Sequence, residues 1–337
     1  MSSLHQSLHK PLAAIVLLAA VALPYAASAL AHDFYVGVVT RIMIFGIVAT
    51  SLNLLIGFGG MVCFGHAAFF GLGAYTVGIL AHHGVDAVWI AWPAAVVVAG
   101  LAACAIGAIS LRTHGVYFIM ITLAFAQMLH YMFVSLAAYG GDDGLPLAQR
   151  STLPGGLDLG QDTTFYYVTL VLLLGVLALV QCLVNARFGR VLQAIRENEQ
   201  RTEAIGYPIF RTKLVAFVIA GAIAGLGGAL IANQNGMVSP SLMYWTQSGS
   251  LMVMVIIGGV GYVYGGLLGA FVLLLFEELL SAWTIHWQLP LGIILLLIVL
   301  YSRNGLASLL VRRPPAPRAS PAADNTVPTP APEQAHA

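Results

Sequence analysis

Long runs of apolar residues recur along the chain and are separated by short polar or glycine-rich segments. A helix needs about 20 apolar residues to cross a hydrocarbon core roughly 30 Å thick. Ten runs approach that length, and each predicts a transmembrane helix. The predicted spans cover residues 11–31, 37–57, 61–81, 88–109, 115–139, 164–185, 214–234, 248–262, 264–282 and 286–302. Glycines interrupt the pair at 248–282, so a re-entrant segment followed by one helix is the alternative there.

The first apolar run also has the features of a cleavable export signal. Lys10 precedes it, Pro24 lies near its end, and Ala27-Ser28-Ala29 supplies the small residues typical of a cleavage site. Residues 1–31 are therefore either a short N-terminal segment with a retained helix or a signal that is removed. The remaining spans keep the same topology in both cases.

Composition indicates an all-α polytopic membrane protein. Hydrophobic residues make up 59% of the 337 positions and charged residues only 8%, whereas soluble domains carry about 25% charged residues. So few charges cannot cover a water-exposed surface of this size, which excludes a soluble enzyme. The net charge of +1 provides no basic field for nucleic acid. The three cysteines lie in apolar runs without C-x-x-C spacing, so neither a metal site nor a disulfide framework is indicated.

The distribution of basic residues predicts the orientation, because cytoplasmic loops carry an excess of Lys and Arg. With the N-terminus inside and ten crossings, all of the 14 Lys and Arg residues except Arg41 and Arg150 fall on the cytoplasmic side. The chain then has a cytoplasmic N-terminus at 1–10, a transmembrane domain at 11–311, an external loop at 140–163, a cytoplasmic loop at 186–213 and a disordered, Pro-rich cytoplasmic tail at 312–337.

The cytoplasmic loop has a helix-forming composition over residues 187–205. In a single helix, Glu197 could pair with Arg201, and Arg196 with Glu199, along one face. Gly206 then offers a left-handed C-terminal cap, and the proline that follows prevents continuation. A charged helix with a small apolar tip suits docking against a soluble protein, although a solvated charged loop is the simpler interpretation.

Four stretches of the chain carry a resemblance to a known family. The segment 187–217, RFGRVLQAIRENEQRTEAIGYPIFRTKLVAF, resembles the EAA-type loop of ABC importer permeases, with Glu203-Ala204-x-Gly206 as its matching core. SLNLLIGFGGMVCFGHAAFFGLGAY at 51–75, TLAFAQM at 122–128 and GGDDGLP at 140–146 agree with the same family. The chain therefore resembles the permease subunits of branched-chain amino acid importers over about 40–312, and in length the larger of their two types.

The resemblance implies a fold, partners and a cargo. The fold would be the type II ABC importer permease fold with an inverted repeat, in the bacterial inner membrane. Two ATPase subunits would dock on the cytoplasmic loop, a second homologous permease would complete the pathway, and a periplasmic binding protein would contact the external loop. The residues assigned to these contacts are Arg196, Glu199, Glu203, Ala204 and Gly206 for the ATPase, and Asp142 and Asp143 for the binding protein. A solvated turn is the alternative interpretation of the two aspartates.

The implied cargo is a branched-chain, hydrophobic amino acid, and urea, other amides or other amino acids remain open because related permeases carry them. The chain itself is not expected to be an enzyme or to bind a cofactor. A phosphate-binding G-x-x-x-x-G-K-[ST] loop needs a Gly-Lys pair, but the only two lysines, Lys10 and Lys213, follow His9 and Thr212. ATP and Mg²⁺ would therefore be used by the partner ATPases.

Glycines cluster at 57–73 and at 258–269, which suggests broken helices of an inverted repeat beside a pathway. Close helix packing is the alternative interpretation, for which Gly221 and Gly225, and likewise Gly261, Gly265 and Gly269, are suitably spaced. Polar residues inside the spans, together with Gly65 in the glycine-rich break, are candidates for lining the pathway; the polar ones are Asn53, His66, Tyr75 and Thr122. Asn53 could equally bond across helices. A self-sufficient, ion-coupled secondary transporter that uses His66 or His130 is the rival from another functional class.

Overall fold

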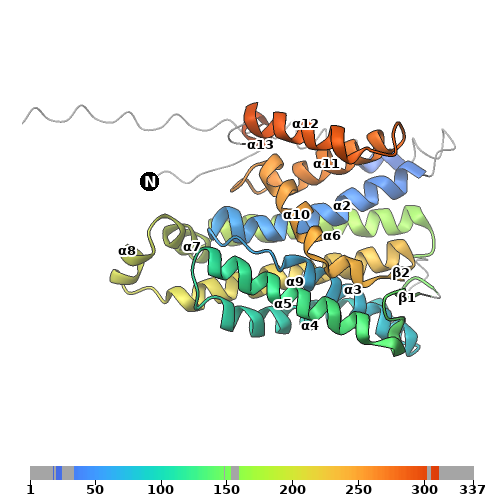
Figure 1. Ribbon diagram of the computed structural model, residues 1–337, viewed down its shortest axis with the longest axis horizontal. Coiled ribbons are helices and arrows are strands. Elements are labelled where there is room, and N and C mark those ends of the chain that lie inside the picture. The colour runs from blue at the N-terminus through green and yellow to red at the C-terminus, as the bar shows by residue number, and fades with distance from the viewer. Residues whose placement is uncertain are drawn as a thin grey trace, which may run out of the picture.

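The computed structural model describes residues 18, 20–24, 34–147, 149–152, 159–301 and 305–310, and nearly all of its regular structure is helical (Figure 1). The first predicted span lies mostly outside the described residues, and so do the predicted segments 1–10 and 312–337. The helices of the first half are α2 (Phe34–Asn53), the π-helical turn η1 (Leu54–Phe58), α3 (His66–His82), α4 (Val88–Ser110), α5 (Val116–Ser135) and the 3₁₀ turn η2 (Ala137–Tyr139).

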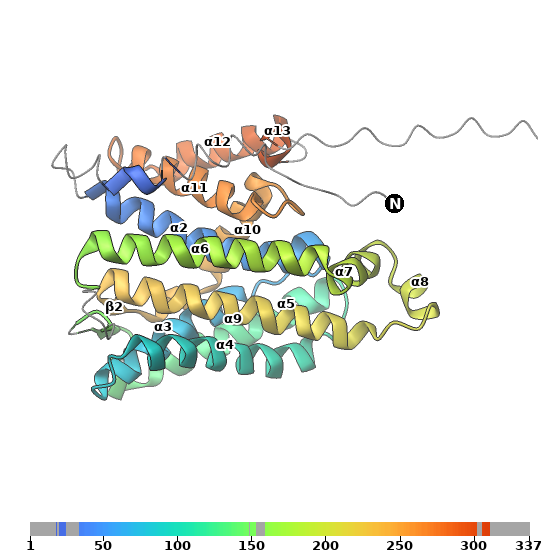
Figure 2. The same ribbon diagram turned by 180° about the vertical axis from the view of Figure 1, so that it is seen from behind.

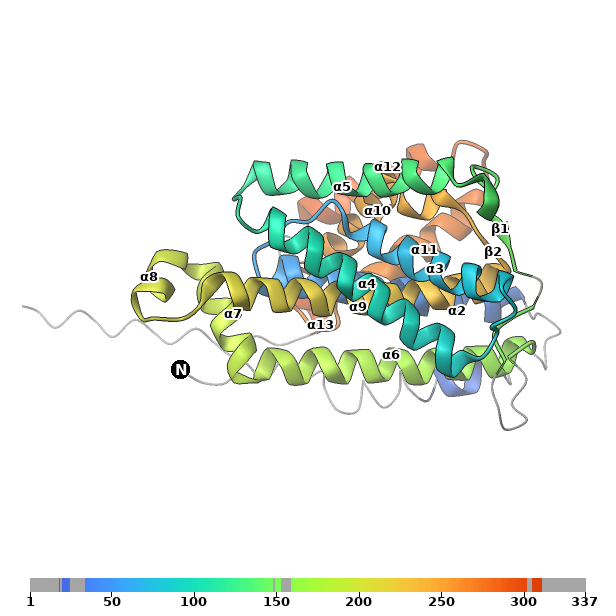
Figure 3. The same cartoon turned by 90° about the horizontal axis from the view of Figure 1, so that it is seen from below.

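The second half begins with α6 (Asp162–Asn185) and enters a two-helix loop, the one predicted to be cytoplasmic. Its remaining helices are α7 (Arg187–Glu197), α8 (Glu199–Ala204), α9 (Ile209–Asn235), the 3₁₀ turn η3 (Pro240–Met243), α10 (Trp245–Gly258), α11 (Gly265–Ser281), α12 (Gln288–Tyr301) and α13 (Ala307–Leu310). Two short strands, β1 (Leu145–Pro146) and β2 (Met237–Val238), pair antiparallel. They lie at the opposite end of the bundle from α7 and α8 (Figures 1 and 3).

Five of the described helical segments are long and apolar enough to cross a membrane. They are Phe34–Phe58, Val88–Ser110, Val116–Ser135, Asp162–Asn185 and Ile209–Asn235. This confirms a polytopic membrane protein, whereas the count of ten spans and the inverted repeat remain predictions. The span predicted at 61–81 begins only at His66, because residues 59–65 leave the helical path before α3 starts. Similarly, the span predicted at 248–262 is the 14-residue helix α10.

The helix α9 lies at the centre of the bundle, between α2, α3 and α4, and glycine makes this packing possible. A Cβ atom at Gly228 would overlap the backbone of Phe70 and Ala74 in α3, and one at Gly225 would overlap Ala99 in α4. Small residues allow such close backbone approach between membrane helices. The packing interpretation of the glycines therefore holds for α9.

The flanks of the bundle differ in what they expose. The helix α5 lies toward the viewer in Figure 1, whereas α6 and α9 do so in the reverse view of Figure 2. Seen from below, α5 and α6 form opposite edges (Figure 3). The two edges therefore present separate surfaces to the surroundings of the subunit.

Candidate functional site

The loop at 186–213, which is predicted to be cytoplasmic, consists of two short helices rather than the one that its composition predicts. Asn198 is extended between them, with φ −158° and ψ 105°, and its side-chain oxygen accepts a hydrogen bond from the Arg201 amide at 2.9 Å. Asparagine favours such capping over a helix interior because its side chain competes for backbone hydrogen bonds. The expectation of a continuous helix over 187–205 is thus wrong, and α7 and α8 can take different directions (Figure 1).

The break also changes the pairing of Glu199. Instead of meeting Arg196, its carboxylate accepts a hydrogen bond from Lys213 Nζ at 2.7 Å and lies 3.5 Å from His114 Nε2. Lys213 belongs to the first turns of α9, and His114 to the turn between α4 and α5. Glu199 therefore ties the start of α8 to two membrane helices.

The tip of the loop ends as the sequence predicts. Gly206 has φ +92°, its amide donates to the Glu203 carbonyl at 2.8 Å, and the next amide donates to Thr202. Glycine suits this left-handed cap because it has no Cβ atom to clash. Glu203 and Ala204 are exposed, and Ile205 keeps 69% of its surface accessible. An exposed apolar tip with a defined cap thus stands among charged side chains.

Arg196 connects this loop to the membrane domain. Its guanidinium Nη1 donates to the carbonyl of Gly57 in the π-helical turn η1. Leu192, one turn earlier in α7, is fully buried beneath the same segment. The end of α7 therefore rests on the point where the α2 helix breaks.

Asn53 connects the break at the end of α2 to a second break, which lies between α10 and α11. Its Nδ2 donates to the Tyr262 carbonyl at 2.6 Å, and its Oδ1 accepts from the Gly261 amide at 3.1 Å. Residues 259–264 form the turn between α10 and α11. Of the two roles that the sequence allows for Asn53, the structure shows the cross-helix bond, with 1% of the residue exposed. Gly57, Asn53 and Arg196 therefore form one junction, called here the coupling junction.

The other pathway candidates are also buried inside the subunit. His66 Nε2 lies 2.7 Å from Ser51 Oγ, and the Tyr75 ring packs on Phe133 with centroids 4.3 Å apart. Thr122 Oγ1 accepts from the Phe64 amide at 3.3 Å, close to Gly65, which lies against the Thr122 backbone. The structure thus gathers Gly65, His66 and Thr122 around the start of α3. In this conformation none of the five candidates lies at the subunit surface.

The structure adds residues that the sequence reasoning missed. Ser248 in α10 accepts a hydrogen bond from the Ala67 amide at 3.0 Å and so caps α3 from another helix. The carbonyl of Pro240, in η3, lies 3.1 Å from His130 Nδ1 and accepts a hydrogen bond in the tautomer that carries the proton on that nitrogen. The sequence signal for the turn at η3 was Ser239-Pro240-Ser241, a polar turn sequence between two apolar runs.

The loop that is predicted to be external holds its two aspartates at a defined turn. Leu145 pairs with Val238, and Gly140, Gly141 and Gly144 all have positive φ. Asp142 and Asp143 are exposed at the turn between these glycines. Both carboxylates therefore face outward from a short segment that is pinned to the end of α9.

Among the residues that the structure describes, no group of three His, Cys, Asp or Glu side chains is arranged to hold a metal ion.

Comparison with known proteins gives a consistent result. Residues 34–301 match the family described as branched-chain amino acid transport system / permease component. The high-affinity branched-chain amino acid transport system permease protein LivM of Salmonella typhimurium is 29% identical over 314 residues, covering 86% of this chain and 73% of the relative. LivM of Escherichia coli K12 is 29% identical, covering 80% and 69%. LivH of the same organism is 24% identical, covering 71% and 82%. No solved structure matches significantly.

Proposed function

Because the chain belongs to the family of permease components of branched-chain amino acid transport systems, we propose that it is the larger, LivM-type permease subunit of a bacterial ABC importer. It carries leucine, isoleucine or valine across the inner membrane, with its C-terminus in the cytoplasm. The observation that carries the proposal is the family match over 34–301, which includes both the cytoplasmic loop and the coupling junction.

The proposal includes partners, because the chain supplies no energy source of its own. A second, LivH-like permease completes the pathway, and two ATPase subunits use ATP and Mg²⁺ on the cytoplasmic side. A periplasmic binding protein delivers the amino acid to the outer face. Support for the permease pair comes from the similarity of this one chain to relatives of both the LivM and LivH types.

In this scheme the loop transmits movement in a fixed order. The exposed tip at Glu203, Ala204 and Ile205 docks on the ATPase, and Gly206 holds its shape. Closure of the ATPases moves α7, and Arg196 passes that movement to Gly57 at the end of α2. Asn53 ties the same point to the α10–α11 turn. Both breaks therefore move together, and the pathway switches from inward-facing to outward-facing.

The test is uptake by proteoliposomes that contain the purified complex and the binding protein. We expect ATP-dependent uptake of radiolabelled leucine that persists when a protonophore collapses the proton gradient. Urea and acetamide serve as cargo controls under the same conditions. If the complex takes up urea but not leucine, urea is the cargo instead of a branched-chain amino acid. Uptake that needs the proton gradient and not ATP would favour an ion-coupled secondary transporter.

A further inference from the structure

Three helices expose surfaces suited to lipid. On α4, α6 and α12 the large exposed side chains near mid-helix are aliphatic, with Leu101 66% exposed, Val171 67% and Leu296 59%. Two of the three cysteines, Cys104 on α4 and Cys182 on α6, are exposed on the same helices. Aliphatic surface of this kind needs no partner in a bilayer, because lipid tails are equally apolar.

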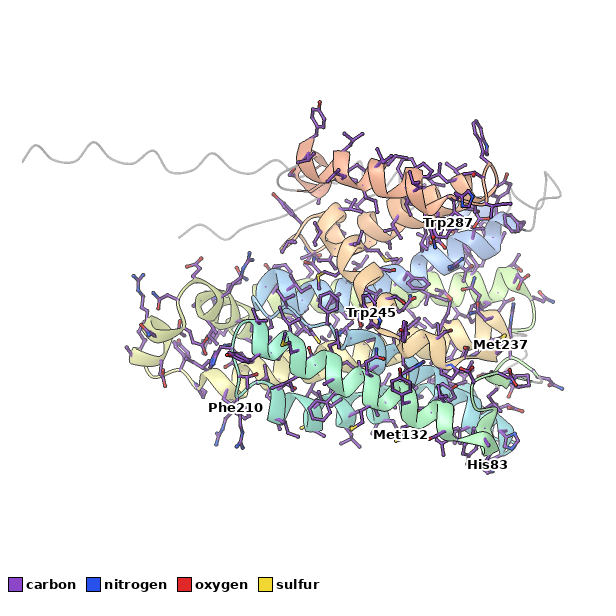
Figure 4. The ribbon with its side chains drawn as sticks, viewed as in Figure 1. His83, Met132, Phe210, Met237, Trp245 and Trp287 are labelled. Atoms are coloured by element: carbon purple, nitrogen blue, oxygen red, sulfur yellow. The ribbon has the colours of Figure 1, made fainter. Side chains whose placement is uncertain are left out.

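The exposed face of α5 has a different chemistry. Its large exposed side chains are mainly methionine and tyrosine, with Met120 63% exposed, Met128 58% and Tyr131 63%. Methionine is flexible and polarisable, which suits a surface that adapts to varied apolar contacts. This face continues into η3 and the start of α10, since the His130 ring lies 5.2 Å from that of Tyr244. Figure 4 shows Trp245 and Met132 on the same side of the molecule.

The segment that leads into α10 lies deep within the bundle. Met243 packs against Gly71 of α3, and Ser248 caps α3 at Ala67. Gly71 is 11 residues from the end of α3 at His82, or about 16 Å at 1.5 Å per residue. With a hydrocarbon core roughly 30 Å thick, η3 and the start of α10 fall inside it.

At this depth the chain leaves the α-helical conformation and exposes polar and aromatic residues. Residues 239–244 are not α-helical, and Ser241, Tyr244, Trp245 and Thr246 are exposed. Tyr244, the residue that precedes α10, makes no side-chain capping bond to its first turn. The first amides of a helix have no partner within the helix, and lipid cannot supply one. Non-helical backbone is tolerated at membrane depth only where protein covers it or water reaches it.

Resting on the proposed function, we propose that this face lines the hydrated path by which the amino acid crosses the membrane. Its lining residues are Ser241, Tyr244, Trp245 and Thr246, with Met128 and Tyr131 of α5. Water and the hydroxyl groups satisfy the exposed backbone and the charged ends of the cargo. The methionine and aromatic side chains contact its apolar side chain. The second permease faces this surface across the path, whereas α4, α6 and α12 face lipid.

Cysteine labelling in the reconstituted complex tests this assignment. The native cysteines are replaced by alanine, and Thr246→Cys or Ser241→Cys is introduced singly. Matched controls retain only Cys104 or only Cys182, which lie on the aliphatic faces. A charged methanethiosulfonate reagent reaches water-exposed thiolates, and a neutral, membrane-soluble maleimide serves as the second probe. Both reagents are applied without nucleotide and with the ATPases trapped closed, with mass spectrometry as the readout.

We expect the charged reagent to modify Thr246→Cys and Ser241→Cys about tenfold or more faster than Cys104 and Cys182, because lipid suppresses ionisation of a thiol. Saturating leucine should slow this modification. If only the neutral reagent reacts, at equal rates at all four positions and in both nucleotide states, the face lies in lipid and the assignment is overturned. No reaction with either reagent would show a dry protein contact and also overturn it. Rapid labelling in a complex that takes up no leucine would instead refute only the proposed function.

Discussion

At the scale of single residues, Asn53 shows how one buried amide can join two breaks. Both ends of its side chain bond to backbone groups of the α10–α11 turn. Asn53→Ala would remove both of these bonds, each worth about 0.5–1.5 kcal/mol. We expect leucine uptake per ATP hydrolysed to fall severalfold in proteoliposomes. Asn185→Ala, at the exposed end of α6, is the control and should keep the wild-type ratio. An unchanged ratio in Asn53→Ala would argue against the coupling junction.

Arg196 makes the other contact of the coupling junction, and its neighbour Arg190 provides a control on the same helix. Only Arg196 donates to Gly57, while Arg190 is exposed. In Arg196→Ala the ATPase should still bind, because the docking tip is intact, but its closure should no longer move α2. The expected result is retained ATPase activity with reduced uptake, whereas Arg190→Ala should behave as wild type. Equal loss in both variants would assign the effect to charge rather than to this contact.

The sequence predicts some of these residues well and others poorly, for a physical reason. The cap at Gly206 depends on local chain geometry, so its neighbours in the sequence suffice to predict it. The role of Asn53 depends on a turn more than 200 residues away, and His66 bonds to Ser51 on another helix. Polarity inside an apolar span signals a constraint, but it does not say whether water or another helix satisfies it.

At the scale of helices, the long spans follow from local sequence, whereas the broken ones depend on contacts between distant segments. The spans near α4, α6 and α9 follow from hydrophobic length alone, and the structure confirms them within a few residues. The shorter helices α3, with 17 residues, and α10, with 14, meet through Ser248 and Ala67, a tertiary contact that hydrophobic length does not encode. The break at Asn198 likewise overrides a helix-forming composition.

The docking tip yields a prediction about the loop as a unit. Gly206→Ala forces a left-handed backbone on a residue with a Cβ atom, at roughly 1–2 kcal/mol. If that strain reshapes the tip, ATPase affinity should fall by about tenfold in a pull-down titration. Glu203→Ala removes an exposed charge from the same tip and should also uncouple hydrolysis from uptake. In both variants the subunit should remain inserted in the membrane, and normal uptake in both would contradict the docking role.

The close contact between α9 and α3 yields a prediction about stability. A side chain at Gly228 would meet backbone atoms of Phe70 and Ala74, which cannot rotate away. Gly228→Leu should therefore lower the stability of the subunit by roughly 1–3 kcal/mol or more, seen as a lower melting temperature in detergent. Gly175→Leu on α6 is the control, because no atom lies within 4 Å of its Cβ position. Similar melting temperatures for both variants would argue against this packing.

At the scale of the whole molecule, the two ends of the bundle differ in structure. One end carries the charged loop of α7 and α8, and the other carries the pinned turn with Asp142 and Asp143. Between them, the face along α5 differs in chemistry from the three aliphatic faces. If each end docks a partner and this flank meets a second permease, as proposed, the subunit is incomplete alone.

The tagged full-length chain, purified from its native membrane in mild detergent, tests that incompleteness directly. Mass spectrometry should recover a second permease and ATPases that carry the G-x-x-x-x-G-K-[ST] loop, because this chain has no Gly-Lys pair of its own. Arg196→Ala should recover the same set, since its docking tip is unchanged, whereas Gly206→Ala should recover less ATPase. The binding protein and leucine are present during purification, so that the complex is as stable as possible. A homo-oligomer without ATPase under these conditions would overturn the importer assignment and make His66 and His130 the next residues to replace.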